Sequence, residues 1–227
     1  MLRITAVLWL ALVSLPALAH DLWIEKEGPE YVLRYGHRGG AVLLIEAAKL
    51  KHILCVNEDD QKVDVLSKAV IEQKAVRIKD RCKCLSVFYY NGYYSLTPDG
   101  EKNLPKNQVN DAVKSWESKE FIKFIETGSG DVTFGDEFEI TVGGDIRTLH
   151  TGDKITVRVL YQGAPAAGAT IACHGHVIGE TDSKGEARVR LRQGGLQFVA
   201  ATLKRPLNIP EADSLALTAG LLFEVAP

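Results

Sequence analysis

The chain has 227 residues, and its 27 lysines and arginines against 29 aspartates and glutamates give a formal net charge of −2 at pH 7. This balance lacks the basic excess of proteins that bind nucleic acid or anionic membrane surfaces, so neither class is expected. The length is sufficient for one large or two small β domains, each with its own core.

Residues 1–19 have the three parts of a secretory signal peptide. Arg3 provides a basic start, residues 4–15 form an apolar run, and residues 17–19 (Ala-Leu-Ala) form a small-residue cleavage site. We expect cleavage after Ala19, which makes His20 the first residue of the mature protein. We therefore predict a periplasmic protein.

Only one other stretch is markedly apolar, and it lies near the C-terminus. Residues 215–225 include Glu224 and are about half as many as the roughly twenty apolar residues that a membrane-spanning helix takes. We expect the mature chain not to span the membrane.

A histidine at a free N-terminus is a strong candidate metal ligand. His20 would offer a metal ion two nitrogens in one chelate, the α-amine and the nearer ring nitrogen. The α-amine has an ordinary pKa of about 7.7 to 8, so a metal ion displaces its proton readily.

A second histidine is expected to lie opposite His20 across a β-hairpin. Apolar residues alternate in 20–25 and again in 31–37, which indicates two strands on either side of Gly28-Pro29. Folding about this turn gives the following opposed pairs: Ile24 with Leu33, Leu22 with Tyr35, and His20 with His37. Directly opposed Cβ atoms lie about 4.5 to 5.5 Å apart, so one metal ion could bridge both rings. A shift of one residue would move His37 to the other face.

The four cysteines, at positions 55, 82, 84 and 173, are interpreted in an oxidising compartment. Cys82 and Cys84 flank Lys83 on a predicted strand, so their side chains point the same way and would not easily bond to each other. We predict that one of them pairs with Cys55, while the pairing of all four stays open. A thiolate metal site is the alternative.

The remainder of the first half is predicted as short strands and loops. Strands are expected at 51–56, 62–66, 74–78 and 85–89, and residues 41–50 fit either a strand or a short helix. Turn residues indicate a surface loop between 91 and 105. Residues 110–125 read as a helix or irregular cover.

From Phe138 the alternation becomes regular, with seven or so short strands at a spacing of about eight to twelve residues. We predict a mainly all-β protein with three parts: a signal peptide (1–19), an N-terminal metal-binding β domain (20–137), and an immunoglobulin-like or transthyretin-like β-sandwich (138–227).

Several segments together resemble the periplasmic components associated with bacterial nickel and cobalt uptake systems. They are His-Asp-Leu-Trp-Ile-Glu at 20–25, Tyr-Gly-His at 35–37, the segment 152–169 that begins Gly-Asp-Lys-Ile, Thr-Asp-Ser-Lys-Gly at 181–185, and Leu-Leu-Phe-Glu-Val at 221–225. The resemblance implies that the mature N-terminal histidine binds a divalent cation, Ni(II) or Co(II), with His37 as its partner. It also implies delivery of the metal to membrane importer subunits rather than catalysis.

The segment Cys173-His174-Gly175-His176 departs from this family pattern. His174 and His176 lie at positions i and i+2, on one face if the strand persists, and form a second candidate metal pair. The alternative is two polar residues at a strand end, with a bend at Gly175. His52 and His150 have no partner in the sequence and are expected to be structural or exposed.

Three other functions fit parts of this pattern. Amine and imidazole nitrogens also suit Cu(II), which binds such ligands most tightly, so a periplasmic copper-binding protein or chaperone is the first alternative. An N-terminal histidine paired with a second one also resembles the histidine brace of copper oxygenases, in which Tyr35 would be the axial residue. An adhesion or scaffold module in which His20 is incidental is the last. Asp21 and Glu25 could orient a ring nitrogen or lie solvated on the strand.

Overall fold

The computed structural model describes residues 21–226. The predicted signal peptide (1–19) and His20 lie outside the described residues. The protein is all-β, with 59% strand, and no described helix reaches seven residues. The predicted fold class is therefore confirmed. Within residues 21–226, no helix is long and apolar enough to cross a membrane.

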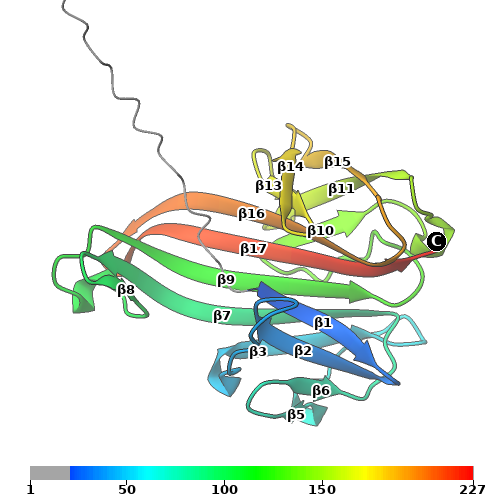
Figure 1. The fold of residues 1–227 in the computed structure, drawn as a ribbon, viewed down its shortest axis with the longest axis horizontal. Helices are drawn as coiled ribbons and strands as arrows, with labels where there is room; N and C mark the ends of the chain where they lie inside the picture. The colour runs from blue at the N-terminus through cyan, green and yellow to red at the C-terminus, as the bar shows by residue number, and fades with distance from the viewer. Residues whose placement is uncertain (1–20, 227) are drawn as a thin grey trace, which may run out of the picture.

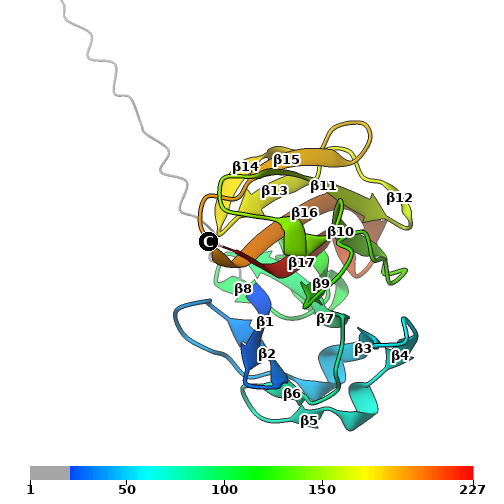
Figure 2. The ribbon, with the colours of Figure 1, turned by 90° about the vertical axis from the view of Figure 1, so that its right-hand side faces the viewer.

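The strands form three stacked sheets (Figures 1 and 2). The large sheet has the order β14 (His176–Glu180), β13 (Thr170–Cys173), β16 (Gly195–Ile209), β17 (Ala212–Val225), β9 (Lys114–Ile125), β7 (Cys84–Thr97), β3 (Leu50–Val56) and β4 (Lys62–Asp64), with β8 (Gly100–Lys102) paired to β7. The first outer sheet has the order β1 (Asp21–Glu27), β2 (Glu30–Gly36), β6 (Val76–Ile78) and β5 (Val70–Ile71). The second consists of β10 (Phe138–Val142), β11 (Lys154–Tyr161), β12 (Ala164–Pro165) and β15 (Glu186–Arg190). Short 3-10 helices lie in the connections: η1 (Ala47–Lys49), η2 (Leu66–Lys68), η3 (Lys106–Gln108) and η4 (Ile146–Thr148).

The large sheet separates two hydrophobic cores. Successive residues of β9 point to opposite faces, so Phe121 and Ile125 pack in the core beneath the β10–β11–β15 sheet, whereas Ile122 and Phe124 pack against the β1–β2 sheet. A strand that is apolar on both faces lies between two covering layers (Figure 2). The central sheet therefore stabilises both halves of the chain.

The predicted boundary between residues 137 and 138 falls in the connection from β9 to β10. Strands from both sides of this boundary nevertheless share the large sheet, because β9 and β17 pair in parallel from Ser214↔Trp116 to Phe223↔Ile125. The two predicted units are therefore joined by a continuous ladder of backbone hydrogen bonds.

Two predictions for the first half were wrong. Residues 110–125, expected as a helix or irregular cover, contain strand β9. From Glu120 to Ile125 this strand is buried on both faces, so it lacks the simple alternation of a half-exposed strand. The loop expected at 91–105 is largely strand: β7 continues to Thr97 through an irregularity between Tyr90 and Gly92. Gly92 has a φ of +88°, which permits this local kink.

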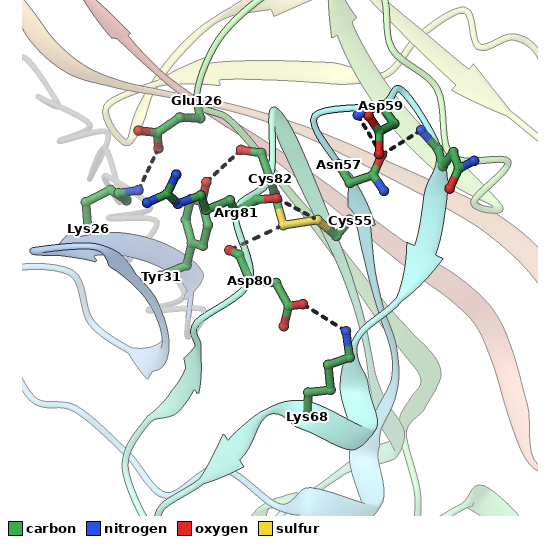
Figure 3. The surroundings of a disulfide bond; sticks show 11 residues. Lys26, Tyr31, Cys55, Asn57, Asp59, Lys68, Asp80, Arg81, Cys82 and Glu126 are labelled. Atoms are coloured by element: carbon green, nitrogen blue, oxygen red, sulfur yellow. Dashed lines mark hydrogen bonds and ion pairs between the residues drawn. A yellow bond between two sulfur atoms is a disulfide. The ribbon is translucent and has the colours of Figure 1, made fainter.

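A disulfide joins Cys55 of β3 to Cys82, just before β7, with a Cα–Cα distance of 5.4 Å. This confirms that one cysteine of the Cys82/Cys84 pair bonds to Cys55. The Tyr31 hydroxyl of β2 donates a 2.7 Å hydrogen bond to the Cys82 carbonyl oxygen (Figure 3). The disulfide is thereby connected to the hairpin of the first outer sheet. Cys84 is a buried free thiol, and Cys173 is a half-buried one.

Candidate metal-binding site at the start of β1

The β1–β2 hairpin has the predicted register. Leu22 pairs with Tyr35 and Ile24 with Leu33, and the described ladder begins with Asp21 opposite Gly36. The strands are joined at Gly28-Pro29, where Gly28 has a φ of +61°. Glycine adopts this positive φ readily because it has no side chain, whereas other residues disfavour it. The ladder therefore holds Asp21, the residue after position 20, opposite Gly36, the residue before His37.

His37 follows β2 directly and begins a tight loop. Its backbone amide donates a 2.9 Å hydrogen bond to the Ala41 carbonyl oxygen, and its own carbonyl oxygen accepts one of 2.8 Å from the Gly40 amide. Gly36 has a φ of +134°, and a Cβ there would lie 2.4 Å from the Ala41 oxygen. The loop closes against Gly36 only because that residue has no side chain. His37 is half-buried and held by this loop.

Two carboxyl groups lie at this end of the hairpin. Glu120 of β9 is buried, and its Oε1 accepts a 2.6 Å hydrogen bond from Asn91 Nδ2. Burial raises the pKa of Glu120 to about 7; the hydrogen bond from Asn91 opposes this shift, and the negative charge of Asp21 adds to it. Asp21 and Glu120 also line a small cleft of about 20 Å³ together with Phe198. The two acids therefore share one cleft, in which Glu120 is only partly ionised near neutral pH.

Tyrosines pack beside these carboxyl groups. The rings of Tyr35 and Tyr89 lie 5.5 Å apart, and Tyr94 stacks on Trp116 at 5.6 Å. Burial, and next the charge of Glu120, raises the pKa of Tyr35 well above its usual range. The phenol consequently stays neutral at physiological pH.

Glu25, considered above as a neighbour of the metal, is committed elsewhere. Its Oε1 accepts a 2.8 Å hydrogen bond from Trp23 Nε1, and its Oε2 accepts one of 2.9 Å from Arg34 Nε. Both oxygens are thus occupied within the hairpin. Asp21, unlike Glu25, lies next to Glu120 and adjoins position 20.

The second candidate pair, His174 and His176, lies at the hairpin turn between β13 and β14. Cys173 pairs with His176, and the two turn residues His174 and Gly175 have φ values of +48° and +80°. His174 Nε2 lies 3.2 Å from Gln197 Oε1, and His176 is exposed. Among the residues that the structure describes, no group of three or more His, Cys, Asp or Glu side chains is arranged to hold a metal ion.

A polar cluster that the sequence did not reveal surrounds His52. His52 Nε2 lies 2.8 Å from Asp136 Oδ1, and the Ser86 hydroxyl donates a 2.7 Å hydrogen bond to Asp136 Oδ2. Serine and histidine both contact the acid rather than each other, so this is not the nucleophile–base arrangement of a hydrolase. The cluster instead anchors the 131–137 segment to the large sheet. These residues are distant in the sequence, and no local pattern announces their contact. His150 is exposed, as expected.

Residues 17–205 match a family described as a domain of unknown function, DUF4198. The chain belongs to this family. The match includes the hairpin, His37, Glu120 and the 173–176 turn. Comparisons with curated proteins and with solved structures gave no match. The family description states no activity, so the link to nickel and cobalt uptake stays a prediction.

Proposed function

We propose that this DUF4198 protein binds a divalent metal ion, Ni(II) or Co(II), in the periplasm and supplies it to a membrane importer. The ligands are the α-amine and ring of the mature N-terminal His20, with the ring of His37. The proposal assigns the protein to capture and delivery of the metal rather than to catalysis.

The register of the β1–β2 hairpin is the observation that carries this proposal. Asp21 is paired with Gly36 in the last pair of the described ladder. Position 20 precedes Asp21 in the sequence and His37 follows Gly36, so the register supports the pairing of these two histidines that the sequence predicts. A register shifted by one residue would have removed the support. The tight loop that holds His37 further favours a preorganised ligand, because less freedom is lost on binding.

The charge around the hairpin end supports a cation as the ligand. Asp21 and Glu120 lie close enough to raise the pKa of Glu120, and the groups that act most strongly on Glu120 include no lysine or arginine. A divalent cation would relieve the repulsion between the two carboxylates. Amine and imidazole nitrogens suit nickel and cobalt, although copper should bind them most tightly, so selectivity would come from geometry or metal supply.

A one-residue N-terminal extension tests the proposal. Protein processed in the periplasm, with its start verified by mass spectrometry, is compared with a version beginning Ala-His, in which the α-amine at position 20 becomes an amide nitrogen. Both retain the rings of His20 and His37, so the comparison isolates the amine. Calorimetric titration with nickel, cobalt, copper and zinc should show a lower affinity in the extended version, because the metal loses one of its ligands. We expect a loss of tenfold or more, which corresponds to at least about 1.4 kcal/mol.

Equal affinities for the two versions would contradict the chelate. A nitrogen site normally binds Cu(II) more tightly than Ni(II) or Co(II). Tight copper binding with negligible binding of nickel and cobalt would therefore favour the copper alternative. Oxygen consumption by the copper-loaded protein with a reductant would favour the oxygenase alternative.

A further inference from the structure

The clearest cationic hollow of the described chain lies at strands β14 and β15. These strands lie on the far side of the molecule from the β1–β2 hairpin (Figures 1 and 2). β14 is the last strand of the large sheet, and β15 pairs only with β11, so two unpaired strand edges face each other there. A cavity of about 200 Å³ opens at this seam. It is lined by Cys173, His174, Ile178, Arg188, Val189, Arg190 and Arg192.

The arginines of this cavity lack carboxylate partners. Arg188 and Arg192 make no ion pair with any residue from 21 to 226, and the contact of Arg190 is a weak 3.4 Å hydrogen bond to the Gly152 carbonyl oxygen. Arg158 on the neighbouring strand differs, because its Nε donates a 3.2 Å hydrogen bond to Glu186. A guanidinium is charged at every physiological pH, so three positive charges line the cavity.

Asp182, in the loop between β14 and β15, is engaged within that loop. Asp182 accepts hydrogen bonds from the backbone amides of Lys184 and Glu186, which lower the pKa of its carboxyl group. It lines an adjacent hollow with Glu180 and Glu186, and this hollow shares Arg188 with the arginine cavity. The lining of the arginine cavity itself contains three arginines and no carboxylate.

His174 adds a polar wall with a defined orientation. The buried Gln197 amide donates through Nε2 to the carbonyl oxygens of Gln193 and Gly195, at 2.9 Å each, so its Oε1 is left as the acceptor. His174 Nε2, which lies 3.2 Å from that oxygen, is thereby assigned the hydrogen. This bond fixes the ring in the wall of the cavity.

We propose that this cavity binds a small anion with two or more negatively charged oxygens, of the phosphate, sulfate or polycarboxylate class, through Arg188, Arg190 and Arg192. Guanidinium groups match the geometry of such oxygens with paired hydrogen bonds. The volume of about 200 Å³ is many times the roughly 10 to 15 Å³ that one water molecule needs on the same measure, so the cavity has room for a small anion. Three guanidinium groups repel a metal cation, so the 173–176 turn is assigned to anion binding. The site is independent of the metal site proposed above.

Calorimetric titration of the processed protein at low ionic strength tests this site, with inorganic phosphate, sulfate, citrate and acetate as probes. At least one of the first three should bind with one-to-one stoichiometry and more tightly than singly charged acetate. Arg188→Gln and Arg192→Gln should each weaken that binding by about tenfold or more, because each removes charge-assisted hydrogen bonds. Arg188→Lys should retain part of the affinity, since it keeps the positive charge but loses the paired N–H donors of the planar guanidinium.

Arg158→Gln is the matched control. It removes the same charge from the adjacent strand, but its guanidinium is already paired with Glu186. Unchanged binding in this variant, with unchanged melting temperatures in all the arginine variants, would support a defined site.

Absence of binding by all the multiply charged anions would overturn the proposal. Equal weakening by Arg158→Gln would overturn it too, because that result indicates diffuse attraction. Binding to phosphatidylglycerol vesicles without binding to free phosphate would instead indicate a membrane-facing surface.

Discussion

Asn91 of β7 donates a 2.6 Å hydrogen bond from Nδ2 to Oε1 of Glu120 on β9, within the buried centre of the large sheet. The carboxyl group of Glu120 has a pKa raised from 4.5 to about 7, chiefly by burial. An acid with a pKa raised on folding holds its proton more tightly in the folded state. The protonated side chain therefore contributes stability below the unfolded pKa.

This stability should be lost as pH rises. The contribution of Glu120 is fully present below about pH 4.5 and disappears as pH rises through about 7. The shift corresponds to at most about 3 kcal/mol in the free energy of unfolding. Urea denaturation of the metal-free protein at several pH values from 4.5 to 8 measures it.

Glu120→Gln provides the control for this pH dependence of the unfolding free energy. The amide is uncharged at every pH, so the difference in unfolding free energy between variant and parent should change across pH 4.5 to 7 and level off above it. A difference that is constant with pH would show that Glu120 titrates as an ordinary exposed carboxyl group.

Breaking a buried ion pair between β9 of the large sheet and β10 of the second outer sheet should be costly. Lys123 Nζ lies 3.0 Å from Glu139 Oε2, and each side chain is only 4% exposed. Lys123→Met leaves the carboxylate without its counter-charge, so we expect a loss of about 3 to 5 kcal/mol in unfolding free energy. The exposed pair Lys68–Asp80, also at 3.0 Å, is the comparison, and Lys68→Met should cost about 1 kcal/mol or less. Similar costs for the two variants would contradict this distinction.

Reduction of the disulfide should lower stability while leaving the metal affinity almost unchanged. Cys55 and Cys82 are 27 residues apart, and closing such a loop usually contributes about 2 to 4 kcal/mol. Urea denaturation with and without a thiol reductant measures this difference, and metal titration of the same samples provides the second readout. Metal release without a change in stability would place the cysteines at the metal site instead.

The hairpin and Asp21 could be predicted from the sequence, whereas Glu120 could not. Alternation in β1 and β2 and the Gly28-Pro29 turn are local signals, and together they define the register that pairs Leu22 with Tyr35. Glu120 lies on β9, whose burial on both faces conceals the strand pattern.

Contacts between distant segments were beyond any local pattern. Asn91 and Glu120 are separated by 29 residues in the sequence, and Ser86 and Asp136 by 50. The parallel pairing of β9 with β17 joins segments about a hundred residues apart, and Trp116 lies opposite Ser214 as a result. Such contacts depend on the tertiary arrangement, and local periodicity does not indicate which distant segments come together.

Replacement of His37 provides the most direct test of the paired-histidine site. His37→Gln keeps the loop, because the hydrogen bonds to Ala41 and Gly40 use the backbone of residue 37. It removes one imidazole ligand, so nickel affinity of the processed protein should fall by tenfold or more, a loss of at least about 1.4 kcal/mol. His176→Gln is the matched control, because it makes the same chemical change at an exposed position of β14.

The dependence of metal affinity on pH should separate the two variants further. Metal must displace protons from imidazole, so the parent and His176→Gln should lose affinity below about pH 6.5, the ordinary pKa of histidine. His37→Gln should be weaker throughout, and its affinity should depend less steeply on pH because one titrating ligand is gone. Calorimetric titration with nickel from pH 5 to 8 measures both effects. Full affinity in His37→Gln together with a loss in His176→Gln would move the metal from the β1–β2 hairpin to the 173–176 turn, and would contradict the anion assignment of that turn as well.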